Sequence, residues 1–329
     1  MNRVAAHARP RVILTDPIHP DAREQLAQAA DVMVLPTAET VAESHAALRS
    51  LLADAHGLIV RRQLPDDIFD APGRLCGVVR HGVGLDFIPV ARATTQHIPV
   101  ANTPGVNANA VAEYVFAAML ATTRRLAEFD RQVRQANWAS RWTAATTTFE
   151  LRGRTIGIIG YGAIGKRVGE IAMLGFGMKV AAHTATPSRL PAGVNAMALD
   201  ALVAASDFVV VACPLTPETR GMVNRDVLAC AKPGCVLINV GRGPVVRQDD
   251  VADALAAGRL KGAVLDVFEV QPLPQDSPLR NHPGVLLTPH LAGITQDAER
   301  AMGMMAAETM LALIRGERPD NTVNKIVWA

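Results

Sequence analysis

The sequence lacks an uninterrupted apolar stretch of the length that a transmembrane helix needs, so nothing in it predicts a membrane span. Residues 1–10 contain Arg3 and Arg9 but no apolar core of signal-peptide length, and we therefore expect a cytoplasmic protein. The formal net charge of +2 is too small to gather nucleic acid, which we do not expect as a partner.

Cysteine is scarce as well. The four cysteines, at positions 76, 213, 230 and 235, lack the paired spacing of metal-ligand sites, and two of them lie in apolar segments typical of buried thiols. We expect these thiols to be structural and reduced, and we expect no metal site.

The chain of 329 residues is longer than one hydrophobic core usually serves, so two domains with a cleft between them are expected. From residue 11 to 100, short apolar runs alternate with helix-like segments, which predicts a parallel sheet wrapped by helices. A second series of six apolar runs begins at TIGIIG and suits a doubly wound nucleotide-binding sheet. Both domains are therefore predicted to be α/β.

Two long helices are predicted outside these series. Residues 107–126 form a predominantly apolar helical stretch, with Asn107 or Asn109 available as its N-cap. Such a helix must be buried, either by the other domain or by a partner subunit. Residues 296–315 have an amphipathic helix pattern, and we expect this helix to return to the first domain.

A glycine-rich turn follows the first strand of the second series. Gly160, Gly162 and Gly165 come directly after an apolar strand and open a helix, which is the context that a dinucleotide-binding turn requires. Without side chains the backbone amides can approach a pyrophosphate, whose charge the helix N-terminus favours. Glycines needed only for a tight turn are the alternative. The predicted cofactor turn also contains Tyr161, Ala163 and Ile164.

The second strand of this series ends without the acid that usually bonds both ribose hydroxyls of NAD. In its place the chain has Thr184, followed by Ser188 and Arg189, which can bond and neutralise a 2′-phosphate. We therefore predict that NADP is preferred and that NAD is possible. The alternative is a solvated Arg189 and a loosely selective adenosine site.

Seven motifs in their order and spacing resemble the D-isomer-specific 2-hydroxyacid dehydrogenases, a family that includes phosphoglycerate dehydrogenase, glyoxylate and hydroxypyruvate reductases, and formate dehydrogenase. The resemblance spans nearly the whole chain. The motifs are RHGVGLD (80–86), VAEYV (111–115), GYGAIG (160–165), PLTPETRGMVN (214–224), INVGRG (238–243), LDVFE (265–269) and TPHLAG (288–293).

This resemblance implies a Rossmann nucleotide-binding domain inserted into a flavodoxin-like substrate domain. We assign residues 1–101 and 296–329 to the substrate domain and residues 102–295 to the NAD(P)-binding domain. The resemblance also implies a homodimer joined through the helix near Val111 to Leu126. The matched motifs imply further cofactor contacts from Cys213, Pro214, Thr219, Val240, Asp266 and Gly293.

Reduction of a 2-keto acid needs a clamp for the carboxylate, a donor for the carbonyl oxygen, and an acid that protonates the alkoxide. Arg242 has a planar fork of donors that can bind carboxylate and carbonyl oxygens together. Imidazole titrates near neutral pH, so His290 can donate a proton in reduction and accept one in oxidation. Both residues match catalytic positions of the family, and the resemblance implies that they carry the chemistry.

The glycine-rich segment from His81 to Gly84 resembles the family's carboxylate loop, in which backbone amides hold the anion. A simple tight turn is the alternative. Arg61, together with Arg62 and Arg80, lies near strand ends of the same domain and could meet a second anionic group, although solvated arginines explain it equally well. The predicted substrate-binding residues are His81, Gly82, Val83, Gly84 and Arg61.

One position departs from the family. Most hydroxyacid-reducing members have a glutamate five positions after the aspartate of the LDVFE motif, where it pairs with the catalytic histidine; here that position is Gln271. An amide can orient the imidazole without adding charge, so His290 should hold its proton less firmly. Glu269 is an alternative partner. Formate dehydrogenases also have glutamine at this position.

The sequence therefore predicts an NADP-preferring dehydrogenase that acts on glyoxylate, hydroxypyruvate or a similar small acid. Formate-type oxidation is one alternative, because of Gln271. A dinucleotide-sensing binding protein with little turnover is another, and it would show tight cofactor binding without catalysis.

Overall fold

The computed structural model describes residues 9–328. The expectation that no signal peptide is present rested partly on residues up to 8, including Arg3, and these lie outside the described residues. Within this range the chain forms two compact units. Unit 1 takes the residues up to Asn107 and from Ile294 onward, and unit 2 takes Ala108–Gly293. The predicted boundaries fall after residues 101 and 295, and the structural divisions after 107 and 293.

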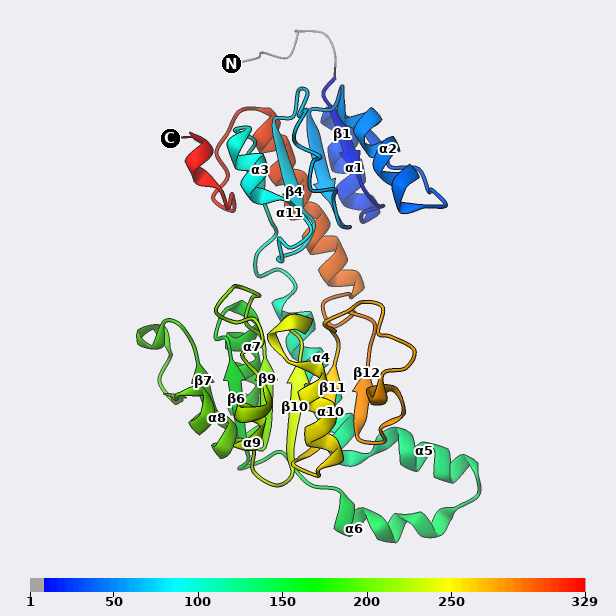
Figure 1. Ribbon diagram of the computed structural model, residues 1–329, viewed down its shortest axis with the longest axis vertical. Coiled ribbons are helices and arrows are strands. Elements are labelled where there is room, and N and C mark those ends of the chain that lie inside the picture. The colour runs from blue at the N-terminus through cyan, green and yellow to red at the C-terminus, as the bar shows by residue number, and fades with distance from the viewer. Residues whose placement is uncertain (1–8, 329) are drawn as a thin grey trace. The chain divides into compact units, whose positions relative to one another are not determined.

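Unit 1 is a five-stranded parallel sheet with helices on both faces (Figure 1). Its strand order, β2-β1-β3-β4-β5, is that of a flavodoxin-like doubly wound fold. The strands are β1 (Arg11–Leu14), β2 (Asp31–Val34), β3 (Gly57–Val60), β4 (Gly77–Arg80) and β5 (Val100–Ala101). The helices are α1 (Pro20–Ala29), α2 (Val41–Leu52), α3 (Val90–Thr95) and α11 (Gln296–Ile314), with a final 3₁₀ turn, η5 (Lys325–Trp328).

Successive residues of the central strands of unit 1 supply two separate cores. Val12 and Leu14 pack with α1 and α11, whereas Ile13 between them packs on the other face with α2. Because both faces of the sheet are covered, the buried residues of its central strands are apolar. Side-chain caps begin three of the helices: His19 caps α1, Thr40 and Glu43 form a capping box for α2, and Thr295 caps α11.

Unit 2 is a seven-stranded parallel sheet in the order β12-β11-β10-β9-β6-β7-β8, a doubly wound nucleotide-binding topology. Its strands are β6 (Thr155–Ile159), β7 (Lys179–His183), β8 (Val194–Ala196), β9 (Phe208–Val211), β10 (Cys235–Asn239), β11 (Leu260–Leu265) and β12 (Val285–Leu287). Its helices are α4 (Ala108–Arg124), α5 (Leu126–Arg134), α6 (Ala144–Thr147), α7 (Ala163–Phe176), α8 (Leu199–Ala205), α9 (Arg225–Ala229) and α10 (Gln248–Ala256), with 3₁₀ turns η1 (Trp138–Thr143), η2 (Pro187–Arg189), η3 (Gly243–Val245) and η4 (Pro278–Asn281).

Two sequence-based expectations for unit 2 were wrong. The six predicted strands omit β8, because this edge strand has three residues and two of them, Asn195 and Ala196, are exposed, so it contains no apolar run. Helix α4 begins directly after Asn107, but the buried Oδ1 of Asn107 has no hydrogen-bond partner among the described residues. A side-chain cap from Asn107 is therefore not formed. The side-chain amide of Asn109 donates to the carboxylate of Glu113 instead.

The apolar face of α4 is buried within its own unit. Val111, Val115 and Met119 share a core with Ile156 of β6 and Val168 of α7. The sequence predicts that either the other domain or a partner subunit buries this helix. Neither is needed, because unit 2 itself buries the apolar face.

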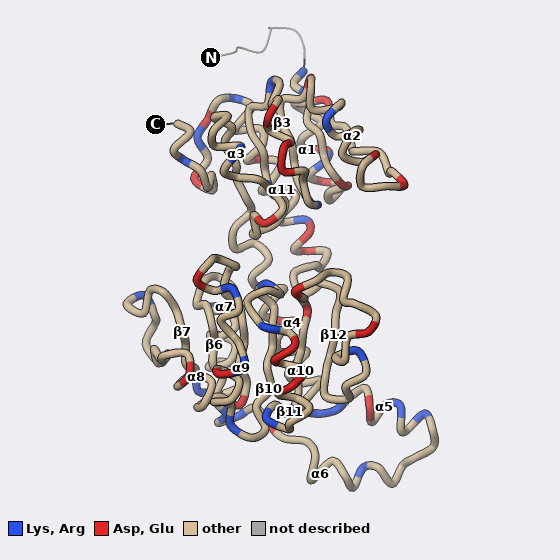
Figure 2. The backbone as a smooth tube through the Cα atoms, viewed as in Figure 1, with Lys and Arg blue, Asp and Glu red and all other residues tan. Residues whose placement is uncertain are grey.

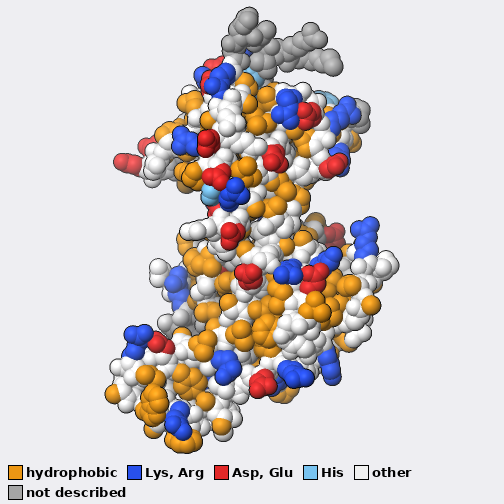
Figure 3. Space-filling model, turned by 180° about the vertical axis from the view of Figure 1, so that it is seen from behind, with side chains coloured by type: hydrophobic (Ala, Val, Ile, Leu, Met, Phe, Trp, Pro, Cys, Tyr) orange, Lys and Arg blue, Asp and Glu red, His pale blue; other side chains and the backbone are white. Residues whose placement is uncertain are grey.

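Beyond α4 the chain forms an arm, which we define as residues 126–147 (α5, η1 and α6). The arm projects from the body of unit 2, and hydrophobic side chains gather at its tip (Figures 1 and 3). Helix α5 has no buried residue at all. The large exposed apolar side chains of the arm are Leu126, Val133, Trp138 and Trp142.

Acidic and basic residues are interspersed in both units (Figure 2), in line with the small net charge of +2. None of the helices within residues 9–328 is both long and apolar enough to cross a membrane.

Candidate active site

The predicted cofactor and catalytic residues of unit 2 follow the carboxyl ends of its parallel strands. The glycine turn follows β6, Cys213 follows β9, Arg242 follows β10 and His290 follows β12. Because the strands are parallel, these ends meet at one edge of the sheet, and the strand order reverses between β6 and β9. Ligands of doubly wound folds bind at such a reversal.

The glycine turn is shaped by close backbone contacts. Gly160 has φ of 93°, and a Cβ added there would lie 2.6 Å from the backbone of Cys213. A Cβ at Gly165 would lie 2.2 Å from the carbonyl oxygen of Gly160. At Gly162, by contrast, a Cβ would meet no atom within 4 Å, so the helix N-terminus opens onto space that a pyrophosphate can enter. The turn fits a dinucleotide.

The neighbours of these glycines have separate positions. Ala163 and Ile164 are the first residues of α7, so their amides point out of the helix start. The hydroxyl of Tyr161 lies over Gly169, where an added Cβ would come within 2.4 Å of it, and burial raises the pKa of this phenol.

The predicted 2′-phosphate residues lie at the end of β7. Thr184 follows the strand and is half-buried, whereas Ser188 and Arg189 lie exposed on the 3₁₀ turn η2. The Thr184 hydroxyl accepts a long bond from the Thr186 amide, at 3.4 Å. His183 closes the strand with a contact between its Nδ1 and the Met197 oxygen at 3.2 Å.

Arg242 lies on a turn that Asn239 holds. The buried Asn239 side chain accepts from the Gly241 amide at 3.1 Å and donates to the Arg242 oxygen at 3.2 Å. A Cβ at Gly243 would come within 1.8 Å of the Phe268 oxygen, so only glycine permits this approach to the segment after β11. The guanidinium of Arg242 donates to the Gly241 oxygen at 2.8 Å.

His290 and Gln271 form a pair at the ends of β12 and β11. The Nδ1 of His290 lies 3.4 Å from Oε1 of Gln271, and both side chains are exposed. An amide oxygen can only accept, so in this contact the proton lies on Nδ1 of His290. Glu269, the alternative partner, instead accepts from the Gln248 amide at the start of α10, at 2.8 Å.

The backbone of His290 is unusual because its φ is 56°, in the left-handed region. Its backbone amide donates to the backbone carbonyl oxygens of Asp266 and Thr288, at 2.9 and 3.0 Å. The buried carboxylate of Asp266 accepts from the amides of Leu291 and Ala292, at 2.8 and 2.9 Å. The predicted cofactor residue Asp266 therefore shapes the turn that presents His290.

A pocket of about 550 Å³ lies beside His290 and Gln271, within unit 2. Its volume falls in the usual range for small-molecule sites. The residues that line it are Phe268, Gln271, Pro272, Leu273, Arg280, Leu287, Thr288, Pro289 and His290.

The remaining predicted cofactor residues differ in burial. Cys213 and Val240 are buried, and burial raises the pKa of the Cys213 thiol to about 11, so this thiol is unreactive at neutral pH. Pro214 accepts a bond from the Thr219 hydroxyl at 2.7 Å, which closes the loop after β9. Gly293 is the last residue of unit 2.

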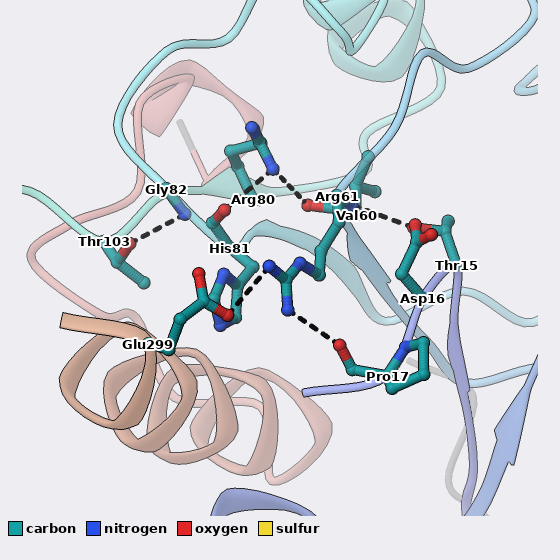
Figure 4. A network of polar contacts seen from close by, with 10 residues as sticks. All are labelled: Thr15, Asp16, Pro17, Val60, Arg61, Arg80, His81, Gly82, Thr103 and Glu299. Atoms are coloured by element: carbon teal, nitrogen blue, oxygen red, sulfur yellow. Dashed lines mark hydrogen bonds and ion pairs between the residues drawn. The ribbon is translucent and has the colours of Figure 1, made fainter. Parts of the chain in front are cut away.

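The predicted carboxylate loop lies in unit 1, after β4 (Figure 4). The Gly82 amide already donates to the Thr103 hydroxyl at 2.9 Å, so it is not available to a substrate. Within residues 9–328, the amides of Val83 and Gly84 have no protein acceptor. The His81 ring is buried beneath the turn, and burial together with the charge of Arg61 lowers its pKa to about 4.

Arg61 is committed to contacts inside unit 1. Its guanidinium pairs with Glu299 of α11 at 2.8 Å and donates to the Pro17 oxygen at 2.7 Å (Figure 4). The neighbouring Arg62 pairs with Asp16. These contacts show why two arginines follow β3, and they compete with a role in binding substrate.

Comparison with known proteins identifies the family. The family described as "D-isomer specific 2-hydroxyacid dehydrogenase, NAD binding domain" matches residues 116–292. A glyoxylate reductase of Aeropyrum pernix is 36% identical, with 97% of each chain covered. The chain belongs to the D-isomer-specific 2-hydroxyacid dehydrogenase family. It is an NAD(P)-dependent oxidoreductase whose substrate is a small 2-keto or 2-hydroxy acid.

Two further relatives of this dehydrogenase are informative. A glyoxylate/hydroxypyruvate reductase B of Pectobacterium carotovorum is 35% identical, over 96% of this chain and 98% of its own. An NADPH-dependent glyoxylate/hydroxypyruvate reductase of Sinorhizobium meliloti, solved with NADP and malonate, is 32% identical with a TM-score of 0.81, over 96% of this chain and 97% of its own.

Three polar residues of the dehydrogenase were missed from the sequence: Asn239, Tyr114 and Thr288. Asn239 could have been found, since a polar residue that ends a buried apolar strand needs a partner. The contact between Tyr114 and Thr288 joins residues 174 positions apart, and no local pattern indicates it. No group of three or more His, Cys, Asp or Glu side chains within residues 9–328 could hold a metal ion.

Proposed function

We propose that this dehydrogenase reduces glyoxylate, hydroxypyruvate or a similar small 2-keto acid and prefers NADPH. The observation that carries the proposal is the grouping at one sheet edge of unit 2, where the open glycine turn, Arg242 and the His290–Gln271 pair follow neighbouring strand ends. The names of the relatives support the substrate class.

Each residue has a proposed role. Arg242 orients the carbonyl and carboxylate oxygens through its fork of donors. His290 gives the proton from Nε2 to the oxygen of the reduced carbonyl, and takes it back in the oxidative direction. Gln271 orients the imidazole from Nδ1 without adding a charge. When bound, NADPH supplies the hydride that reaches C2 of the keto acid.

Unit 1 is proposed to bind the substrate carboxylate through backbone amides. The amides of Val83 and Gly84 are the candidates, because Gly82 bonds Thr103 and His81 is buried beneath the turn. Arg61 is retained as a candidate only for a substrate with a second anionic group that displaces Glu299.

The preference for NADPH rests on the segment after β7. It has Thr184, Ser188 and Arg189 in place of the acid that would bond the ribose hydroxyls of NAD and repel a 2′-phosphate. The exposed position of Arg189 leaves its guanidinium within reach of solvent anions. A charge-assisted contact from this residue would favour the phosphorylated cofactor.

The test is the initial rate of the purified protein with NADPH and NADH in parallel, against glyoxylate, hydroxypyruvate, pyruvate and phenylpyruvate. We expect turnover of glyoxylate or hydroxypyruvate, faster with NADPH. Phenylpyruvate is included because the pocket of about 550 Å³ beside His290 is larger than glyoxylate requires. Tight cofactor binding with no turnover of any acid would contradict the proposal and favour a dinucleotide-sensing protein.

A second candidate function is formate-type oxidation, which the Gln271–His290 pair favours because hydride leaves formate without a proton from the protein. Formate oxidation with NAD or NADP, in the absence of keto-acid reduction, would establish it in place of the first.

We further propose a homodimer. The apolar face of α4 is buried within unit 2, so the contact with a second copy is assigned to the arm, whose Leu126, Val133, Trp138 and Trp142 are exposed. Sedimentation should give twice the mass of one chain, 35.0 kDa each. We also propose a cytoplasmic location, which suits the four free thiols.

A further inference from the structure

The turn that presents His290 is held in a conformation that residues with a Cβ seldom adopt. Its φ of 56° is less favourable than the right-handed alternatives, so neighbouring groups must impose it. Asp266 accepts four hydrogen bonds from this turn. Its backbone carbonyl oxygen accepts from the amide of His290. Its carboxylate accepts from the amides of Leu291 and Ala292 and from the hydroxyl of Thr288. Asp266 is therefore the centre of the turn.

The hydroxyl of Thr288 is part of a longer chain of hydrogen bonds. Its Oγ1 donates to Oδ1 of Asp266 at 2.6 Å and lies 2.6 Å from the hydroxyl of Tyr114. A threonine hydroxyl has one proton, and Thr288 donates it in the hydrogen bond to the carboxylate of Asp266. Tyr114 must therefore be the donor in the bond between the two hydroxyls. Burial raises the pKa of the Tyr114 phenol, which therefore keeps its proton. The order is Tyr114 to Thr288 to Asp266.

This hydrogen-bond chain connects two distant parts of the sequence. Tyr114 lies on α4, the first helix after the chain enters unit 2 at Ala108. Thr288 to Ala292 are the last residues before the chain leaves unit 2 after Gly293. The chain of bonds thus ties the entry helix to the exit segment, and His290 lies inside the tied segment.

We propose that Tyr114 and Thr288 are positioning residues that hold His290 in its left-handed conformation through Asp266. Hydrogen bonds that act in series on a charged acceptor reinforce one another, so the loss of either hydroxyl loosens the turn. The effect on turnover rests on the proposed function, in which His290 exchanges the proton. The effect on the turn itself does not.

The test uses four single variants of the full-length protein and the double variant Tyr114→Phe/Thr288→Val. Tyr114→Phe removes the first donor, Thr288→Val removes the second, Thr288→Ser keeps the hydroxyl, and Thr123→Val is the matched control. Thr123 is a buried threonine of α4 whose hydroxyl bonds a helix carbonyl, that of Leu120, at 3.4 Å. The measured quantities are kcat, the KM for the keto acid, and the dissociation constant of NADPH.

We expect Tyr114→Phe to lower kcat about threefold to tenfold, and Thr288→Val to lower it about 10- to 100-fold, because the second lost bond has a charged acceptor. The KM and the NADPH dissociation constant should change less than about twofold. Thr288→Ser should recover most of the rate. The double variant should match Thr288→Val, since Tyr114 acts through Thr288.

A second readout needs no turnover. Amide hydrogen exchange at Leu291 and Ala292, without substrate or cofactor, should be about tenfold faster in Thr288→Val and unchanged in Thr288→Ser and Thr123→Val. Unchanged exchange in Thr288→Val would overturn the inference, and so would equal losses of kcat in Thr288→Val and Thr288→Ser. If the parent protein reduces none of the keto acids while exchange responds as expected, the proposed function fails and the positioning of the turn stands.

Discussion

The two units share one architecture but use the polar residues at their strand ends differently. In unit 2 the buried side chains of Asn239 and Asp266 bond backbone amides, and in doing so they shape the turns that present Arg242 and His290. In unit 1 the buried hydroxyls of Thr15 and Thr103 also accept from backbone amides. The charged side chains after β3, however, pair with other charged side chains, as Arg61 does with Glu299. The same fold thus yields one edge built to present side chains and one that offers mainly backbone amides.

The strongest way to break this comparison is to exchange arginine for lysine at equivalent places. We expect Arg242→Lys to lower kcat/KM for the keto acid about 100-fold or more, because lysine cannot bind two oxygens with a planar fork. Arg61→Lys should change it less than about threefold, since Arg61 is paired inside unit 1. Steady-state kinetics with NADPH measures both.

Arg225→Lys serves as the control for unit 2, because Arg225 is an exposed residue paired with Asp250 and Asp253. A large rise in KM for Arg61→Lys would contradict the comparison and would mean that unit 1 contributes a cation to substrate binding. Equal losses in Arg242→Lys and Arg225→Lys would remove Arg242 from the site.

The next prediction concerns the stability of unit 1. Burial, with the nearby Arg61, lowers the pKa of His81 to about 4, below its ordinary value of 6.5. The unfolded chain therefore binds an extra proton between about pH 6.5 and 4, so stability falls as the pH falls through this window and is unaffected above it. At pH 5 the loss should be about 2 kcal/mol.

Urea unfolding at pH 7.5 and pH 5 measures this loss. Trp328 is the tryptophan of unit 1 in the sequence, so its fluorescence reports on that unit once Trp138 and Trp142 are replaced by phenylalanine. His81→Gln should lose less stability between the two pH values than the parent, whereas His45→Gln, on α2, should behave as the parent. Equal losses in the parent and His81→Gln would show that another group titrates.

A smaller effect is expected at the adenosine end of unit 2. Arg189→Ala should lower kcat/KM for NADPH about tenfold and leave that for NADH within about twofold, because only NADPH has the 2′-phosphate. Arg259→Ala is the matched control, an exposed arginine at the amino end of β11, the opposite edge of the sheet. An equal decrease with both cofactors would remove Arg189 from phosphate recognition.

Much of the fold follows from local sequence patterns. Fully buried parallel strands read as apolar runs, which is why β3, β9 and β10 could be predicted, whereas the short and partly exposed β8 could not. The residues that follow these runs were equally accessible, because parallel strand ends meet at one edge of a sheet. Placement of Arg242 and His290 at that edge needed the order of elements but no distances.

What the sequence could not reveal are the partners of these residues. The pairing of Arg61 with Glu299 and the contact of Tyr114 with Thr288 join segments far apart in the chain, and periodicity carries only local information. The commitment of the Gly82 amide to Thr103 is of the same kind. Such contacts decide which of several candidate donors remain available to a ligand. A sequence motif therefore does not by itself define a binding site.

The finest test of the comparison changes one atom pair at the edge of unit 2. Gln271→Glu places a carboxylate beside the Nδ1 of His290, now 3.4 Å from the amide oxygen, and should raise the pKa of the imidazole. Reduction requires protonated His290, so the decline of kcat/KM at alkaline pH should move upward, and the shift should be small because both side chains are exposed. Gln275→Glu adds the same charge to the same loop and should leave the profile in place. Coincident profiles for the parent and Gln271→Glu would mean that Gln271 does not govern the proton of His290.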